Sequence, residues 1–251
     1  MPMPKTKNFL INFLNIAGLG PIFGAIQGAL FGPAAFLWIT LGTIFIGCIH
    51  DFFAGFMSIR EDGLTMPKIV SKYLGFGLEK FVAVLIIITG ILVSATFAKG
   101  AADLISNLTQ IPVLICITII FIYFLIATVF PIDKIIGRTY PIFGALLLIM
   151  VVIMTAGVIL NPTYTIPEFT TQGLYLTDKS IFPYLFVTIA CGAISGFHAS
   201  QAPIVSRCIE NEKDARPVFF GSMVVEGLVA LCWAAIAMAF FHSQPPTCSN
   251  L

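Results

Sequence analysis

The stretch AGLGPIFGA (Ala17–Ala25) interrupts the first long hydrophobic segment of the chain, and ACGAISGFHA (Ala190–Ala199) interrupts a later one. Glycine and proline weaken a helix, and in hydrocarbon the freed backbone groups are tolerated only where protein or a wet cavity satisfies them. Helix breaks at matching positions of two halves are the best sequence indication of a transporter's binding site. The two stretches therefore predict a substrate site near the middle of a bilayer.

The composition is that of an integral membrane protein. The 251 residues are 58% hydrophobic and 10% charged, and the mean hydropathy is +1.00, whereas soluble proteins are about 25% charged. The six cysteines are scattered without metal-ligand spacing, so we expect no metal and no cofactor. The sequence has no nucleophile–base pair that would indicate an enzyme and no phosphate-binding loop that would indicate a primary pump. Nothing in it predicts a nucleic-acid partner.

Seven hydrophobic segments approach or exceed the roughly 20 residues that a helix needs to cross a bilayer. We predict an all-α protein with the N-terminus in the cytoplasm, because eleven of the thirteen Lys and Arg residues then lie inside and only Lys99 and Lys179 lie outside. A polar tail, residues 242–251, follows the last span. The predicted spans are Phe9–Leu30, Ala34–Ser58, Phe81–Leu104, Ile111–Phe130, Tyr140–Leu160, Ile181–Ala202 and Pro217–Phe241.

The interruptions fall in the first and sixth of these spans, which indicates a repeat of five helices. An odd repeat places its two copies in opposite orientations, as in transporters built from inverted repeats. We therefore expect a five-plus-five fold with broken helices 1 and 6. This chain would contain the first repeat and the start of the second, so we expect an incomplete bundle, for which a second chain is a possible partner.

Three segments resemble the carbon starvation protein A family. They are NIAGLGPIFGAIQGALFGPAAFLWITLGTIFIGCIHDFFAGFMSIREDG (Asn15–Gly63), FPYLFVTIACGAISGFHASQAP (Phe182–Pro203) and PIDKIIGRTYPIFGALLL (Pro131–Leu148), the last of which is similar to the shorter, clostridial-type members. The resemblance covers nearly the whole chain up to about Phe241. It implies an inner-membrane secondary transporter that takes up peptides or pyruvate during carbon starvation. It also implies further spans beyond those present here, which indicates a truncated or partial member.

The glycine-rich breaks hold the expected substrate-binding residues. Exposed N-termini of half-helices present N–H groups and partial positive charge, which suit the carboxylate that peptides and pyruvate both carry. Gly24 and Gly28 also fit close helix packing, since Gly20, Gly24, Gly28 and Gly32 are spaced by four. The candidate substrate-binding residues are Gly18, Gly20, Pro21, Gly24, Gly192, Ser195, Gly196 and His198.

Three ionisable residues inside the spans are candidates for proton coupling. Glu226 lies roughly 14 Å along its helix from Pro217, near the midplane, and no Lys or Arg shares its span. Burying its charge would cost at least about 2.5 kcal/mol, so we expect it to be protonated at rest. Asp51 is either a second intramembrane acid or a residue at the inner interface that acts as a cap or pairs with Arg60 or another basic residue. His50 is either a proton relay or a packed histidine.

The leading hypothesis is a proton-coupled secondary transporter, with sodium as the less favoured ion. The alternatives are a non-transporting sensor, a partner subunit that needs another chain, and an inactive fragment. A retinal protein is excluded because the last span has no lysine for a Schiff base. Between the second and third spans, LTMPKIVSKYLGFG (Leu64–Gly77) predicts an amphipathic helix at the membrane surface.

Overall fold

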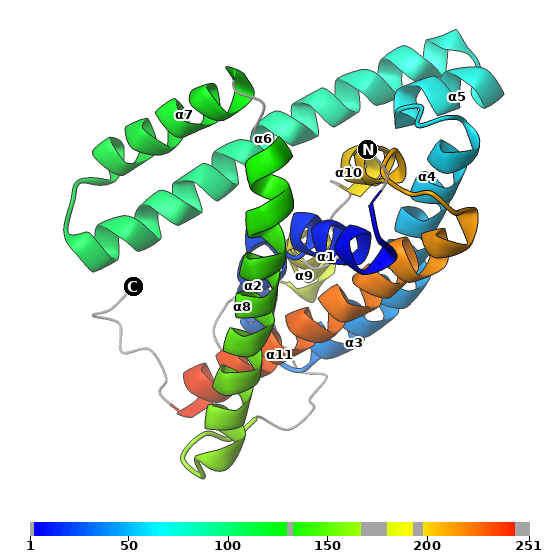
Figure 1. Cartoon of the computed structure of the whole chain (residues 1–251). Coiled ribbons are helices and arrows are strands. Elements are labelled where there is room, and N and C mark those ends of the chain that lie inside the picture. Colours follow the sequence, from blue (N-terminus) through cyan, green and yellow to red (C-terminus); the bar gives the residue numbers. More distant parts are fainter. Residues whose placement is uncertain (1–2, 130–132, 167–179, 193–197, 244–251) are drawn as a thin grey trace.

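The structure is a computed structural model, and it describes residues 3–129, 133–166, 180–192 and 198–243. Every regular element in this part of the chain is helical. The elements form a bundle, and one pair of helices extends away from it (Figure 1).

The first predicted span is a bent pair of helices. α1 (Lys5–Ile16) and α2 (Leu19–Ala29) meet at Ala17 and Gly18 with a bend of 47°. The break precedes the site expected from Pro21, since Gly20 and Pro21 already lie in the first turn of α2. The first N–H groups of a helix have no intrahelical acceptor, so Pro21 removes no hydrogen bond there.

The second span runs without interruption from Ala34 to Arg60 as α3 (Ala34–Gly42), the π-helix η1 (Thr43–Gly47) and α4 (Cys48–Arg60). Gly32, with a φ of 67°, forms the turn that joins it to α2. α5 (Met66–Leu74) is the helix predicted between the second and third spans. It buries Ile69 and leaves Lys68 and Lys72 exposed.

α6 (Phe76–Thr109) and α7 (Val113–Val129) pack against each other as an antiparallel pair outside the bundle (Figure 1). α6 has 34 residues, of which only Ala102 is buried. It approaches the bundle at Gly100, where an added Cβ would lie 3.1 Å from the ring of Phe23 on α2. We call this pair the α6–α7 hairpin.

The rest of the chain supplies the centre of the bundle. α8 (Asp133–Leu160) packs on α1 and α11, and α9 (Ile181–Gly192) packs on α2. α10 (His198–Ser206) packs on α1 and α4. The 3-10 helix η2 (Glu212–Asp214) and the π-helix η3 (Arg216–Phe220) lead into α11 (Gly221–Ser243), which contributes twelve buried residues.

The helical stretches Ala34–Arg60 and Glu212–Ser243 approach closely because glycines lie between them. A Cβ added to Gly55 of α4 would lie 2.3 Å from the ring of Phe219 of η3, and one added to Gly47 of η1 would lie 2.6 Å from Cε of Met223. From the opposite side, a Cβ on Gly227 would lie 2.6 Å from Cγ2 of Thr43. A larger residue at Gly55 or Gly227 would force its neighbour to shift, whereas the flexible end of Met223 can move aside for one at Gly47.

Four helical stretches of the described residues are long and apolar enough to cross a membrane, and the bent α1–α2 pair makes a fifth. They are Ala34–Arg60, Phe76–Thr109, Ile142–Leu160 and Glu212–Ser243. The fourth and sixth predicted spans hold the shorter apolar helices Val113–Ile126 and Ile181–Ala190. A multi-span helical membrane protein is therefore established, and the count of seven spans stays a prediction.

Candidate functional site

The four candidate residues of the first break lie where α1 meets α2. Gly18 is in the break itself, whereas Gly20, Pro21 and Gly24 lie on α2, and all three are buried. Gly28, one turn further along, faces Ile189 of α9, because an added Cβ would lie 3.1 Å from Cγ1 of that side chain. The packing interpretation therefore applies to Gly28.

The second interruption is described only at its edges. α9 ends at Gly192 and α10 begins at His198, while Ser195 and Gly196 lie outside the described residues. The helices on either side are paired with those of the first break: α2 packs on α9, and α1 packs on α10. The two segments that we expect to bind substrate therefore flank a common region of the bundle.

Six polar side chains are buried together in this region, and we call them the polar cluster. They come from α1, η1, α4, α10 and α11, and each is at most 4% exposed. Such a concentration is costly in a membrane protein and is typical of a functional site. The polar cluster consists of Asn12, Thr43, Asp51, His198, Ser222 and Glu226.

His198 and Glu226 form the ionisable pair of the polar cluster. Nε2 of His198 lies 3.8 Å from Oε2 of Glu226, and the two side chains are 1% and 0% exposed. Neither has a hydrogen-bond partner among the described residues. The structure thus brings together a candidate substrate contact and a candidate coupling residue that are 28 positions apart in the sequence.

Asp51 is a buried residue and not an interfacial cap. Its side chain is fully buried, and its Oδ2 accepts a hydrogen bond from Nδ2 of Asn12 at 3.3 Å. Arg60, the partner expected under the interfacial interpretation, pairs with Glu212 instead. That interpretation is wrong because Asp51 lies on the face of α4 that packs against α1, α10 and α11. Asp51 and Glu226 are close enough to interact electrostatically.

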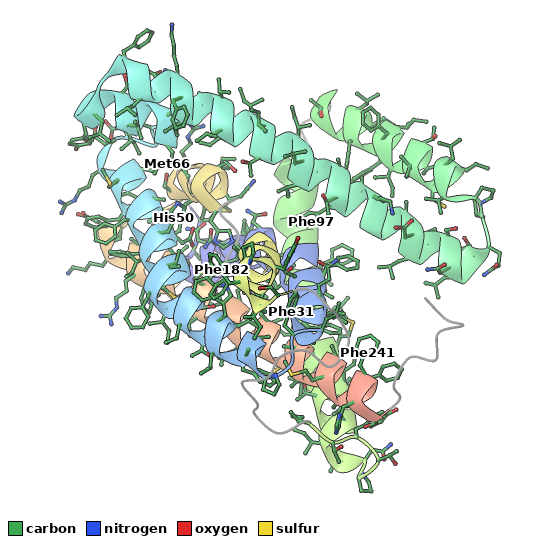
Figure 2. All side chains as sticks on the ribbon, turned by 180° about the vertical axis from the view of Figure 1, so that it is seen from behind. Phe31, His50, Met66, Phe97, Phe182 and Phe241 are labelled. Carbon is green, nitrogen blue, oxygen red and sulfur yellow. The ribbon has the colours of Figure 1, made fainter. Side chains whose placement is uncertain are left out.

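His50, next to Asp51 on α4, is half-buried (Figure 2). It lies within electrostatic range of His198. It is therefore a neighbour of the polar cluster, and its assignment as a proton relay stays a prediction.

The sequence interpretation missed Asn12, Thr43 and Ser222. Nδ2 of Asn12 also donates to Oγ of Ser222 at 2.6 Å and to the carbonyl oxygen of Val218 at 3.2 Å. One signal was present: Asn8 and Asn12 are four residues apart in an apolar segment, so they share one helix face. Among the described residues, no group of three or more His, Cys, Asp or Glu is placed to hold a metal ion.

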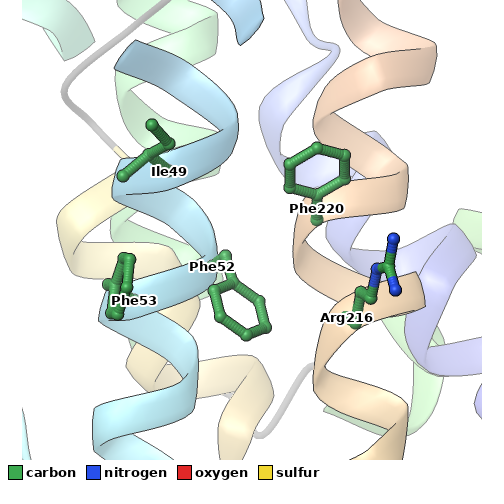
Figure 3. Close-up of a pocket in the computed structure, with 5 residues that line it drawn as sticks. All are labelled: Ile49, Phe52, Phe53, Arg216 and Phe220. Carbon is green, nitrogen blue, oxygen red and sulfur yellow. The ribbon is translucent and has the colours of Figure 1, made fainter. Parts of the chain in front are cut away.

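A groove between α4 and η3 is distinct from the polar cluster (Figure 3). Its volume is about 210 Å³, and four of its five lining residues are apolar. None of the residues expected to bind substrate or protons lines it. The lining residues are Ile49, Phe52, Phe53, Arg216 and Phe220.

Comparison with known proteins relates the chain to transporters. The chain is 39% identical to an uncharacterized membrane protein of Haemophilus influenzae, over 97% of this chain and 80% of that protein. It is 26% identical to the peptide transporter CstA of Helicobacter pylori and 25% identical to the pyruvate/proton symporter BtsT of Escherichia coli. These matches cover 96% and 92% of this chain but only 44% and 41% of those transporters.

No solved structure matches the chain. The model of the family described as carbon starvation protein CstA matches residues 1–119 and 81–245. With a relative that is 39% identical over most of both lengths, this match identifies the chain as a member of the carbon starvation protein CstA family.

Proposed function

We propose that this chain forms a proton-coupled secondary transporter of the inner membrane for small nutrients that carry a carboxylate, either peptides or pyruvate. The observation that carries the proposal is the buried pair of His198 and Glu226, whose Nε2 and Oε2 atoms lie 3.8 Å apart. The relatives named as a peptide transporter and a pyruvate/proton symporter support the substrate class and the coupling ion.

The proposed substrate site lies at the two breaks. α2 begins directly after Gly18, and His198 is the first described residue of α10. Free N–H groups at the start of α2 would attract the substrate carboxylate. The imidazole of His198 belongs to the first turn of α10 and also faces Glu226, so the same residue would sense both substrate and proton.

Glu226 is the proposed proton carrier. It lies near the middle of the helical stretch Glu212–Ser243 and is fully buried, so its charged form is costly there. A group of this kind is loaded with a proton when the site opens to one side and releases it when the site opens to the other. His198, whose Nε2 lies 3.8 Å from Oε2 of Glu226, is placed to accept that proton.

The proposal includes the seven-span topology with a cytoplasmic N-terminus and the five-plus-five repeat. The paired half-helices, α1 with α10 and α2 with α9, support it, because an inverted repeat brings its two broken helices together in this way. Cysteines placed at residues 61 and 213 should be labelled from the cytoplasmic side only. Labelling of residue 213 from outside would contradict the topology.

The test of the activity is uptake by the purified chain in liposomes. Labelled pyruvate and a labelled dipeptide would be offered with an inward proton gradient, with an inward sodium gradient and with neither. We expect accumulation of one of them in the proton arm and its loss on addition of a protonophore. Accumulation only in the sodium arm would contradict proton coupling, and no accumulation in any arm would contradict the transporter.

A second candidate, a subunit that another chain completes, is favoured by the α6–α7 hairpin. In the window of α6 that is apolar enough to cross a membrane, none of the residues is buried. Crosslinks between cysteines on exposed α6 positions and a second protein would support this candidate. If the exposed α6 positions crosslink only to lipid, the candidate of a subunit that another chain completes is contradicted.

A further inference from the structure

Asn12 connects the first half of the broken span to the acidic residues. It lies on α1, five positions before Ala17, where the helix breaks. Its amide nitrogen donates to Asp51 on α4 at 3.3 Å and to Ser222 on α11 at 2.6 Å. One side chain thus joins three helices at the centre of the bundle.

These contacts lie close to the bent joint of the broken span. The helical stretch Ala34–Arg60 packs closely on the stretch that contains η3 and α11, since a Cβ added to Gly55 of α4 would lie 2.3 Å from the ring of Phe219 of η3. α1, in contrast, continues into α2 through a bent and non-helical joint at Ala17 and Gly18. A turn of α1 about this joint would move the Asn12 amide relative to Asp51.

We infer that Asn12 is a positioning residue that couples movement of α1 to the protonation of the acidic residues. Because Asp51 is fully buried, the loss of its hydrogen bond from Asn12 favours the neutral carboxyl group over the charged one. Asp51 interacts electrostatically with Glu226, so this change reaches the proposed proton carrier. The inference rests on the proposed transport function.

Other titratable groups face the same region and must be considered in any pH profile. Among the described residues, Cys48 on α4 interacts with both carboxyl groups. His198 on α10 faces Glu226 and interacts with His50. Among the described residues, the amide of Asn12 donates hydrogen bonds to Asp51, Val218 and Ser222 and to none of these groups, so a change at Asn12 acts on them through Asp51.

Asn8 provides a matched control on the same helix. It lies one turn before Asn12, is 1% exposed, and donates from Nδ2 to the carbonyl oxygens of Met3 and Cys208, both at 3.0 Å. Its amide therefore bonds to backbone oxygens and, among the described residues, to no titratable group. Asn8→Ala removes a comparable buried amide without touching the acids.

The first readout is the pH profile of proton-driven uptake in liposomes. Asn12→Ala should lower kcat/KM roughly three- to twentyfold, the range for a hydrogen bond between membrane helices, and should displace the midpoint of the profile. Asn8→Ala should leave the midpoint unchanged. In an Asp51→Asn background, Asn12→Ala should have no further effect on the midpoint. Asn12→Gln, which keeps an amide donor, should restore part of the wild-type profile.

The second readout does not depend on transport. The infrared band of the Asp51 carboxyl, identified by its loss in Asp51→Asn, should shift in Asn12→Ala and stay in place in Asn8→Ala. The proposed role of Asn12 would be overturned if Asn12→Ala and Asn8→Ala gave the same position of the Asp51 band. It would also be overturned if the two variants displaced the midpoint of the pH profile equally. If the wild type shows no proton-driven uptake, the proposed function fails, while the infrared comparison still decides whether Asn12 acts on Asp51.

Discussion

The bundle around α11 and the α6–α7 hairpin are equally helical but are built in opposite ways. α11 buries twelve residues, among them Ser222 and Glu226, and its neighbours bring further polar groups to its surface. α6 is longer by eleven residues, yet only Ala102 is buried, and its exposed face holds Phe81, Ile87 and Ile91. Figure 2 shows side chains that project outward along the whole length of the hairpin.

The difference shows which residues of a membrane protein are constrained by their surroundings. An exposed Phe or Ile costs nothing in lipid, because lipid tails are as apolar as the side chain. A buried carboxyl is costly in lipid and in protein alike, so its position requires a function or a partner. Substitutions in the bundle and in the α6–α7 hairpin should therefore have effects on transport and stability that differ in kind as well as in size.

The largest effect is expected from Glu226→Gln in the bundle. Glutamine keeps the shape and hydrogen-bonding capacity of Glu226 but cannot release a proton, so gradient-driven accumulation should be abolished. Exchange of labelled for unlabelled substrate, which needs no net proton movement, should be retained. Both are measured in liposomes with labelled substrate.

The control for Glu226→Gln must lie outside the polar cluster. Asp51→Asn is unsuitable, since Asp51 is buried in the same cluster. Glu79→Gln, in the first turn of α6, removes the same charge far from it and should leave accumulation unchanged. Accumulation by Glu226→Gln with unchanged pH dependence would make Glu226 structural and leave His198 as the next candidate.

A smaller effect is expected from adding one methyl group to each region. Gly55→Ala should destabilise the bundle by about 1–3 kcal/mol, because the new Cβ would lie 2.3 Å from the ring of Phe219. Gly90→Ala on α6 meets nothing within 4 Å and should be neutral or slightly stabilising. Thermal unfolding in the same detergent measures both, and equal shifts in Tm would remove the distinction between the regions.

The smallest effect is expected where α5 joins the two regions. The hydrogen bond from Lys72 lowers the pKa of the Glu61 carboxyl below its usual value. The stabilisation that this pair gives to the folded state is therefore fully present at a pH above the usual pKa of a glutamate. It is lost as the pH falls through the lowered pKa of Glu61. On acidification, amide exchange of residues 66–74, corrected for its intrinsic pH dependence, should rise slightly.

The Lys72→Gln variant should show this faster amide exchange of residues 66–74 already at neutral pH. Lys68→Gln, on the same helix, is the control, since Lys68 has no ion-pair partner among the described residues. A pH response that survives Lys72→Gln would assign it to another group.

The elements of the fold were largely predictable, because hydrophobic length and glycine content are local properties of the sequence. α5 was predicted from its own amphipathic pattern, and the break in the first span from Gly18. The position of the break differed, because a proline in the first turn of a helix is tolerated, so the joint lies at Ala17 and Gly18, before Pro21.

The environment of the candidate site was less predictable. Asp51 and Arg60 both lie on α4, and packing shows that Asp51 faces inward whereas Arg60 reaches Glu212. Asn12 acquires its importance from Ser222, which is 210 positions away. Contacts of this kind depend on which helix faces are opposed, and a single sequence does not contain that information.

The length of α6 has a consequence for the thickness of the membrane. Its 34 residues span about 51 Å, whereas the hydrocarbon core is about 30 Å thick. The apolar run between Lys80 and Lys99 is about 27 Å long, which is close to that thickness, and further turns of α6 follow Lys99. Gly100, in those turns, is the position that contacts Phe23 of α2. A change in acyl-chain length would therefore shift this contact relative to the bundle and act on α2, the second half of the broken span.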